Sequence, residues 1–269
     1  MRGLATRPVQ GRPQPRRARE PNARPAVVAF HGAKGGVGTT TLAVESAVAV
    51  ARAGANVALV DLDLYGGDAH YRLDVAVPPG AHTVAGLLPV IEELDGRIIG
   101  SAFSRCPCGV SLLPSPAGLP EAALFAPEHV RTVVSAARAA FDLVVLDTSS
   151  GAGDVTLEAL ECCDLAVIVV SPEISCLGAT LKILDRLGPG GPAGRPRALI
   201  INRSLGRSDL VTTREVEGFL GLSASAVIPE AAAAFRRAAD EGQTIGSDRS
   251  GPGRIIRETA ARLFAASFP

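Results

Sequence analysis

From residue 26 onward, short apolar runs alternate along the chain with longer segments that lack helix breakers. Apolar runs bounded by Gly, Pro or polar residues predict buried strands, and the longer segments predict helices. The predicted strands cover residues 26–30, 56–60, 109–113, 141–146, 165–170, 197–201 and 226–228. The predicted helices cover residues 40–52, 128–140, 176–187, 213–220, 231–240 and 254–266. This alternation predicts an α/β fold with a doubly wound, mostly parallel sheet flanked by helices.

The first 25 residues lack this pattern. They hold seven arginines against one glutamate and show no apolar periodicity. We therefore expect residues 1–25 to form a disordered basic tail, which is either an interaction arm or the product of an upstream start codon. Residues 26–269 are expected to form one domain.

Composition and charge narrow the class of protein. Over all 269 residues, 27 basic and 27 acidic side chains give a formal net charge of zero, which argues against a chain built mainly to neutralise a polyanion. No apolar run is long enough to span a bilayer, and no apolar segment of a secretory signal precedes the first strand. We expect a cytoplasmic protein whose five cysteines are reduced thiols. These are Cys106, Cys108, Cys162, Cys163 and Cys176.

A glycine-rich segment lies between the first predicted strand and the first predicted helix. It reads Gly32-Ala-Lys34-Gly-Gly-Val-Gly38-Thr39-Thr40-Thr41. A strand, a Gly-rich loop and a helix N-terminus together form a cradle of backbone N–H groups for phosphate, and a hydroxyl early in the helix can bind Mg²⁺. The simplest alternative is a Gly-rich turn that binds nothing.

Two further strands end on carboxylates. Asp61 and Asp63 close the second predicted strand, and Asp147 closes the strand over residues 141–146. The carboxyl ends of parallel strands form the edge where ligands bind in open α/β sheets. We therefore expect these side chains to lie beside the glycine-rich loop.

The loop resembles the deviant phosphate loop of the ParA/MinD family of ATPases, in which a lysine precedes two glycines, as Lys34 does here. The resemblance covers roughly residues 26–269. It implies Mg²⁺ and ATP as cofactors and a homodimer that closes around two nucleotides. It further implies that Lys34 reaches across the dimer to the partner's phosphates.

Four later motifs resemble the same family in the same order. They are Asp61-Leu-Asp63, the strand and switch from Phe141 to Gly151, Asn202-Arg203, and Pro229-Glu230. The resemblance assigns catalysis to Asp63, Lys34 and Asp61, and Mg²⁺ to Thr40, Asp61 and Asp147. It assigns nucleotide binding, with Asn202 on the adenine, to Lys34, Gly35, Gly36, Val37, Gly38, Thr39, Thr40, Thr41, Asn202, Arg203, Pro229 and Glu230.

Thr39 stands where the standard phosphate loop has lysine. The run from Lys34 to Thr41 looks like the CpaE/TadZ branch, whose members act in the localisation and assembly of Flp-type (tight-adherence) pili and secretion systems. Because the hydroxyl of Thr39 carries no charge, we expect weak ATP hydrolysis. The implied partners are a second copy of the chain and pilus or secretion proteins.

Two alternatives stay open at this stage. The chain could be a ParA/MinD-type positioning ATPase for DNA partition or septum-site determination, or a scaffold that does not hydrolyse ATP. We interpret the last helix as packed on the sheet, with peripheral attachment to the inner face of the membrane or the cell pole as the alternative. Arg236, Arg237 and Arg249 could contact DNA, but we interpret them as a solvated face and expect no nucleic-acid partner.

Overall fold

The computed structural model describes residues 26–77, 82–188, 196–245 and 251–265. The predicted tail at residues 1–25 lies outside this range. The described chain forms an eight-stranded sheet in the order β3-β4-β2-β5-β1-β6-β7-β8, in which only the β3–β4 pair is antiparallel. The strands are β1 Ala26–His31, β2 Val57–Leu62, β3 Ser104–Arg105, β4 Ser111–Leu113, β5 Leu143–Thr148, β6 Leu165–Val170, β7 Arg197–Ser204 and β8 Ala224–Pro229.

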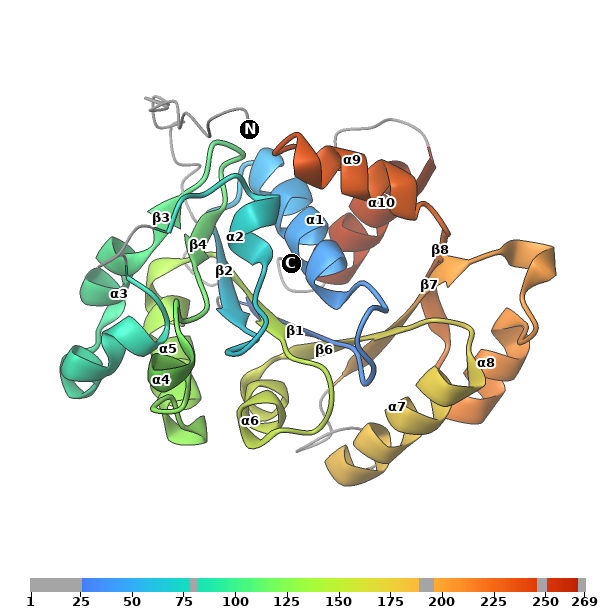
Figure 1. The fold of residues 1–269 in the computed structure, drawn as a ribbon, viewed down its shortest axis with the longest axis horizontal. Helices are drawn as coiled ribbons and strands as arrows, with labels where there is room; N and C mark the ends of the chain where they lie inside the picture. The colour runs from blue at the N-terminus through green and yellow to red at the C-terminus, as the bar shows by residue number, and fades with distance from the viewer. Residues whose placement is uncertain (1–25, 78–81, 189–195, 246–250, 266–269) are drawn as a thin grey trace.

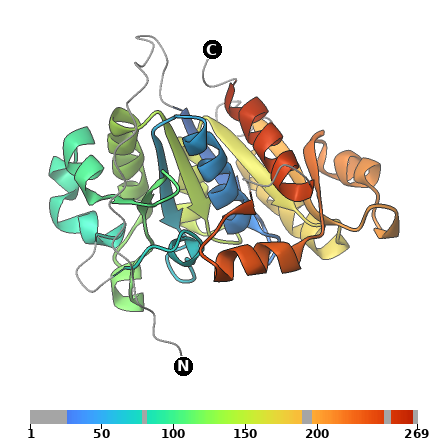
Figure 2. The same cartoon turned by 90° about the horizontal axis from the view of Figure 1, so that it is seen from above.

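Helices cover both faces of the sheet, as the doubly wound prediction requires (Figures 1 and 2). In Figure 1, α1, α9 and α10 lie above the strands, and α6, α7 and α8 lie below them. The helices are α1 Thr39–Arg52, α2 Ala69–Arg72, η1 Ala85–Glu93, α3 Gly96–Ala102, α4 Leu119–Ala122, α5 Pro127–Ala140, α6 Asp154–Cys162, α7 Ile174–Leu187, η3 Gly206–Ser208, α8 Thr213–Leu220, α9 Ala232–Asp240 and α10 Gly251–Ala265. The predicted fold class is confirmed.

All predicted strands and helices are present, with ends shifted by a few residues. The sequence pattern missed α6 and the short elements α2, α3, α4, η1, η3 and β3. The elements β3, η3, α2 and α4 have only two to four residues each, too few for a helical or strand period to stand out. In η1, Pro89 and the non-helical backbone of Val90 also interrupt the helix.

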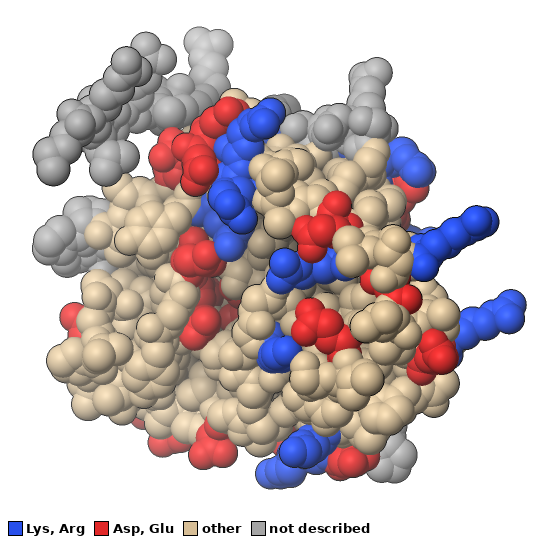
Figure 3. Space-filling view, turned by 45° about the vertical axis from the view of Figure 1, so that its right-hand side comes forward, with Lys and Arg blue, Asp and Glu red and all other residues tan. Residues whose placement is uncertain are grey.

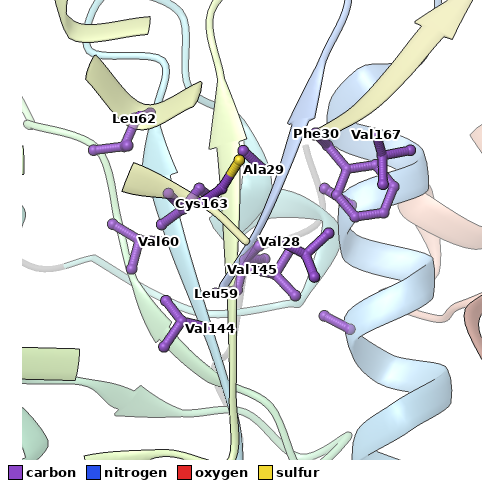
Figure 4. Close-up of a cluster of buried hydrophobic side chains, with 14 of the residues drawn as sticks. Val28, Ala29, Phe30, Leu59, Val60, Leu62, Val144, Val145, Cys163 and Val167 are labelled. Carbon is purple, nitrogen blue, oxygen red and sulfur yellow. The ribbon is translucent and has the colours of Figure 1, made fainter. Parts of the chain in front are cut away.

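The core is built from the central strands, which are buried on both faces (Figure 4). Every residue of β1, β2 and β5 is buried, because helices lie above and below them. Cys163 lies within this cluster of side chains, so it is a packing residue. A rigid core at this place fixes the positions of the strand ends described below.

The last helix, α10, packs on the body of the protein. Ile256, Ala260 and Phe264 are each only 2% exposed and belong to the core cluster, and α10 contacts α1 and β8. This arrangement accounts for the apolar side of the helix through packing, as the sequence analysis favoured. In the part of the chain that is described, no helix combines the length and the apolar character needed to cross a bilayer.

Candidate functional site

The carboxyl ends of β1, β2 and β5 meet at one edge of the sheet. Asp61 on β2 is paired in register with Asp147 on β5, and Phe30 on β1 is paired with the same Asp147. Both aspartates are fully buried. Because β1 leads directly into the glycine-rich loop, the register alone brings that loop beside the two carboxylates.

At two positions, the backbone of the glycine-rich loop has a conformation that only glycine adopts without strain. Gly36 and Gly38 have positive φ angles of 82° and 96°. A Cβ atom on Gly38 would also lie 2.4 Å from the Asn202 amide nitrogen. The helix α1 starts at Thr39, and its N-cap residue, Gly38, has no side chain that could cap the first N–H groups of the helix. The loop therefore presents free backbone donors at a helix N-terminus, which is a site for an anion such as phosphate.

The end of β7 holds this loop in place. The Asn202 side-chain amide donates to the Val37 carbonyl at 2.7 Å, and the Arg203 guanidinium donates to the Gly36 carbonyl at 2.9 Å. Arg203 also pairs with Glu230 at 2.9 Å, and this hydrogen bond holds the pKa of Glu230 below its usual range. Asn202 and Arg203 thus contact the loop directly, and Glu230, the residue after β8, contacts it through Arg203.

Lys34 makes its side-chain contacts with residues that follow β6. Its ammonium group donates to the Ser175 hydroxyl at 2.7 Å and to the Glu173 carboxylate at 3.2 Å. The lysine and glutamate side chains are 43% and 57% exposed, so the ion pair lies in contact with solvent. Sequence reasoning did not single out Glu173 and Ser175. Their position just after β6, at the same sheet edge, is the signal that could have found them.

Within the described residues, no ion pair neutralises the buried carboxylates of Asp61 and Asp147. Burial raises the pKa of Asp61 to about 7, and two backbone N–H donors, from Asp63 and Ala69, offset this only in part. Burial, followed by the neighbouring Asp61, raises the pKa of Asp147 well above its usual range. Within the described residues, neither oxygen of Asp147 has a hydrogen-bond partner. Burial also raises the pKa of Asp63, which is half-buried.

This carboxylate pair fits a divalent cation. Mg²⁺ is commonly held by one or two carboxylates together with a hydroxyl and phosphate oxygens. Asp147 offers two orphaned oxygens, Asp61 faces it across the β2–β5 pair, and the side chain of Thr40 lies close enough to Asp147 to oppose the rise in its pKa. The three residues assigned to Mg²⁺ from the sequence are therefore brought together.

A cavity of about 410 Å³ opens beside the loop. It joins the loop to the segments after β7 and β8, so it has room for a base and a sugar next to the phosphate cradle. The sequence analysis had not assigned its remaining walls, which come from α2 and α9. The lining residues are Gly36, Gly38, Thr41, Asp68, Tyr71, Arg72, Asn202, Arg203, Glu230, Ala231, Ala232, Phe235, Arg236, Ala239 and Asp240.

Three further predicted site residues, Thr39, Pro229 and Gly35, lie around the loop and the end of β8. Thr39 packs over Gly32, since a Cβ on that glycine would lie 2.4 Å from the threonine hydroxyl oxygen. Pro229 is the exposed last residue of β8 and pairs with Ser204 of β7. Gly35 lies on the outer part of the loop, near the Ser150 hydroxyl.

His31, the last residue of β1, contacts the last residue of β5. Its Nδ1 atom lies 2.9 Å from the Thr148 hydroxyl, which itself donates to the Phe30 carbonyl at 2.9 Å. Because the hydroxyl proton is used in that bond, Nδ1 of His31 is the donor to Thr148. Burial lowers the pKa of His31 to about 4, and a hydrogen bond with the Ser149 backbone opposes this shift only in part.

Comparison with known proteins gives one family and several relatives. The family model of the AAA domain matches residues 25–187. An uncharacterized ATP-binding protein of Methanocaldococcus jannaschii is 28% identical over 247 residues, which cover 90% of this chain and 88% of the relative. The septum site-determining protein MinD of Bacillus subtilis is 26% identical, with coverage of 91% and 90%.

The fold has a close counterpart among solved structures. The crystal structure of the cell division ATPase MinD from Pyrococcus furiosus matches with a TM-score of 0.77 at 25% identity, covering 90% of this chain and 99% of that one. The sheet and its flanking helices thus correspond to a known P-loop ATPase architecture.

The buried His31 generates a prediction about acid stability. In the unfolded chain its pKa is near 6.5, and in the folded protein it is about 4, so unfolding takes up a proton as the pH falls below 6.5. The folded protein should therefore lose about 3 kcal/mol of unfolding free energy from this group between pH 7 and pH 4. Urea unfolding of His31→Gln at both pH values should show a smaller loss than the wild type. The exposed His82→Gln serves as the control, and an unchanged pH slope in His31→Gln would contradict the assignment.

Proposed function

The chain belongs to the AAA-domain family, within the ParA/MinD group of P-loop ATPases, and from this premise we propose that it is an ATP-binding protein that dimerises on nucleotide and hydrolyses ATP weakly. The observation that carries the proposal is the uncapped helix N-terminus and glycine-rich loop beside the orphaned carboxylate of Asp147. Free N–H donors fit phosphate, and the carboxylate fits the cation that accompanies it.

We assign the nucleotide to the loop and its neighbouring cavity. Residues 34–41 surround the phosphates with backbone N–H groups. Asn202 and Arg203 line the cavity while also holding the loop, so base binding and loop geometry depend on the same two side chains. Pro229 and Glu230 flank the base from the end of β8.

The cation site is assigned to Thr40, Asp61 and Asp147. Mg²⁺ bound there would neutralise the buried negative charge and shield the phosphates. Asp61 is held by the N–H groups of Asp63 and Ala69, so its carboxylate is fixed before the cation arrives. Asp63 is half-buried and is our choice for orienting the attacking water.

Hydrolysis is proposed to be weak because of Thr39. A lysine at this position would place a full positive charge beside the β- and γ-phosphates. A charge-assisted hydrogen bond contributes about 1.5–3 kcal/mol, against about 1 kcal/mol for a neutral one. Binding survives this loss through the backbone donors, whereas stabilisation of charge in the transition state decreases.

The first candidate cellular role is the localisation or assembly of a Flp-type pilus or secretion apparatus. The run Lys34-Gly-Gly-Val-Gly-Thr-Thr-Thr favours this role, because it looks like the CpaE/TadZ branch. The partners would then be proteins of that apparatus.

The second candidate role is positioning in DNA partition or septum-site determination, which the similarity to MinD proteins over most of the chain favours. On the face shown in Figure 3, Lys and Arg are interspersed with Asp and Glu, so this face lacks the continuous basic surface expected of DNA binding. The genes adjacent to the one encoding this chain distinguish the two roles: pilus genes support the first, and a partition or septum partner supports the second.

Titration calorimetry tests the nucleotide site. We expect Mg-ATP and Mg-ADP to bind the wild type. Asp147→Asn should weaken the contribution of Mg²⁺ by roughly tenfold or more, because one of the two buried carboxylates loses its charge. Asp185→Asn removes an exposed acid on α7 and should bind as the wild type does. Absence of binding to both nucleotides with Mg²⁺ present would reject the proposed function.

Steady-state turnover tests the role of Thr39. Thr39→Lys should raise kcat by about 5–30-fold, the equivalent of about 1–2 kcal/mol of added charge stabilisation. Thr39→Ser keeps a neutral hydroxyl and should leave the rate near that of the wild type. An equal rate in wild type and Thr39→Lys would show that the charge at this position does not limit hydrolysis.

Analytical ultracentrifugation tests the dimer. We expect ATP to shift the wild type to a dimer in which each Lys34 contacts the partner's nucleotide, and Lys34→Ala to remain a monomer. The substitution should leave the fold intact, since the Lys34–Glu173 ion pair is exposed and such pairs contribute little. Lys182→Ala, which removes the only other lysine of the chain, is the matched control. ATP-dependent dimers of Lys34→Ala would contradict the proposed contact.

A further inference from the structure

A tight turn at the far edge of the sheet brings two cysteines together. The turn runs from Cys106 to Gly109 and joins β3 to β4. The Gly109 N–H donates to the Cys106 carbonyl at 3.0 Å, and the Cys106 N–H donates to the Val110 carbonyl at 2.8 Å. Pro107 presets the second turn position, and Gly109 adopts a φ of 97°. The turn geometry is thus fixed by its own sequence.

The two thiols differ in access. Cys106 is 3% exposed, whereas Cys108 is partly exposed and lies next to the exposed Pro107. The Cys106 thiol donates to the Ser104 carbonyl at 3.9 Å, and its interaction with the neighbouring Cys108 thiol lowers the pKa of Cys108 to about 7, assisted by the Val110 backbone and the charge of Arg52. The same interaction, together with burial, raises the pKa of Cys106. The pair therefore has one accessible thiol that ionises readily and one buried thiol beside it.

The other three cysteines lack this combination. The Cys162 thiol lies on α6 and donates to the Glu158 carboxylate at 3.2 Å, so it is outside any such turn. Cys163 and Cys176 are fully buried. All five are free thiols.

We propose that Cys106 and Cys108 form a redox-active dithiol that exchanges with low-molecular-weight disulfides such as glutathione disulfide. The Cys108 thiolate attacks one sulfur of the small disulfide, forming a mixed disulfide and releasing one small thiolate. The Cys106 sulfur then attacks the Cys108 sulfur, loses its proton to solvent and displaces the second small thiolate. Two protein thiols are oxidised to one disulfide, and one small disulfide is reduced to two thiols.

A disulfide closed across a single intervening residue is strained, and strained or exposed disulfides are the readily reduced ones. The product is therefore a reversible modification of the turn, not a structural bond. The turn precedes β4, whose first residue Ser111 pairs with Ala58 near the start of β2. Asp61 lies at the opposite end of β2, so oxidation occurs away from the proposed nucleotide site.

Mass spectrometry of the full chain tests the proposal, because trypsin separates the cysteines. One tryptic peptide, residues 106–131, carries Cys106 and Cys108, and another, residues 139–182, carries the other three cysteines. The protein is treated with glutathione disulfide at pH 7, blocked with N-ethylmaleimide and digested. We expect the first peptide to lose two hydrogens, to escape alkylation, and to regain both thiols after dithiothreitol.

Variants separate the two steps. Cys106→Ser should retain glutathione on Cys108, because the resolving thiol is missing, and Cys108→Ser should react slowly. Cys108 should hold about tenfold more thiolate than an ordinary thiol at pH 7, and iodoacetamide should alkylate it faster than Cys162. Cys162→Ser should behave as the wild type does. The proposal is overturned if the 106–131 peptide stays fully alkylated, or if wild type and Cys106→Ser accumulate the same mixed disulfide.

Discussion

The buried negative charge at the ends of β2 and β5 is the constraint on which the arrangement of this edge depends. Asp61 and Asp147 lie in register with no cation among the described side chains to neutralise them, and burial raises the pKa of both. A fold that keeps two carboxylates in this state loses stability, since each charged form is poorly solvated. Such a cost is typical of a site that is completed by a ligand. The glycine-rich loop beside the carboxylates offers backbone N–H donors, which favour an anion. A magnesium ion bound to phosphate would therefore satisfy the carboxylates and the N–H donors together.

The loop gains its shape from across the sheet as well as from its own glycines. Asn202 and Arg203, consecutive residues at the end of β7, bind the consecutive carbonyls of Val37 and Gly36. Arg203 does so with a φ of 60°, a conformation that a non-glycine residue rarely adopts, and the ion pair with Glu230 helps to hold it. The residues proposed to bind the base are therefore hydrogen-bonded to the loop proposed to bind the phosphates.

Much of this site could be predicted because strand order and strand ends follow from the hydrophobic pattern. The rule that parallel strands present their carboxyl ends at one edge was enough to place Asp61, Asp147 and the loop together. It could not say which side chains meet there, because rotamers and loop paths are set by tertiary contacts. The attachment of Lys34 to Glu173 and Ser175, and of Asn202 to the loop carbonyl, depends on such contacts. The same limit applies to Cys106 and Cys108, because the interaction between their thiols depends on a turn of four residues.

The position of Lys34 connects the single chain to its proposed dimer. Its contacts to Glu173 and Ser175 are exposed, and exposed ion pairs contribute about 0–1 kcal/mol. A charge-assisted contact to phosphate in a dry interface contributes about 1.5–3 kcal/mol, so transfer of the lysine from Glu173 to a partner's nucleotide is favourable. Without a nucleotide there is no phosphate for Lys34 to contact, and the lysine keeps its ion pair with Glu173. Thr39 leaves the proposed phosphate site without a lysine from its own chain, so the partner's Lys34 supplies the lysine charge there. Dimer assembly should therefore depend on the bound nucleotide more strongly than in a chain with lysine at position 39.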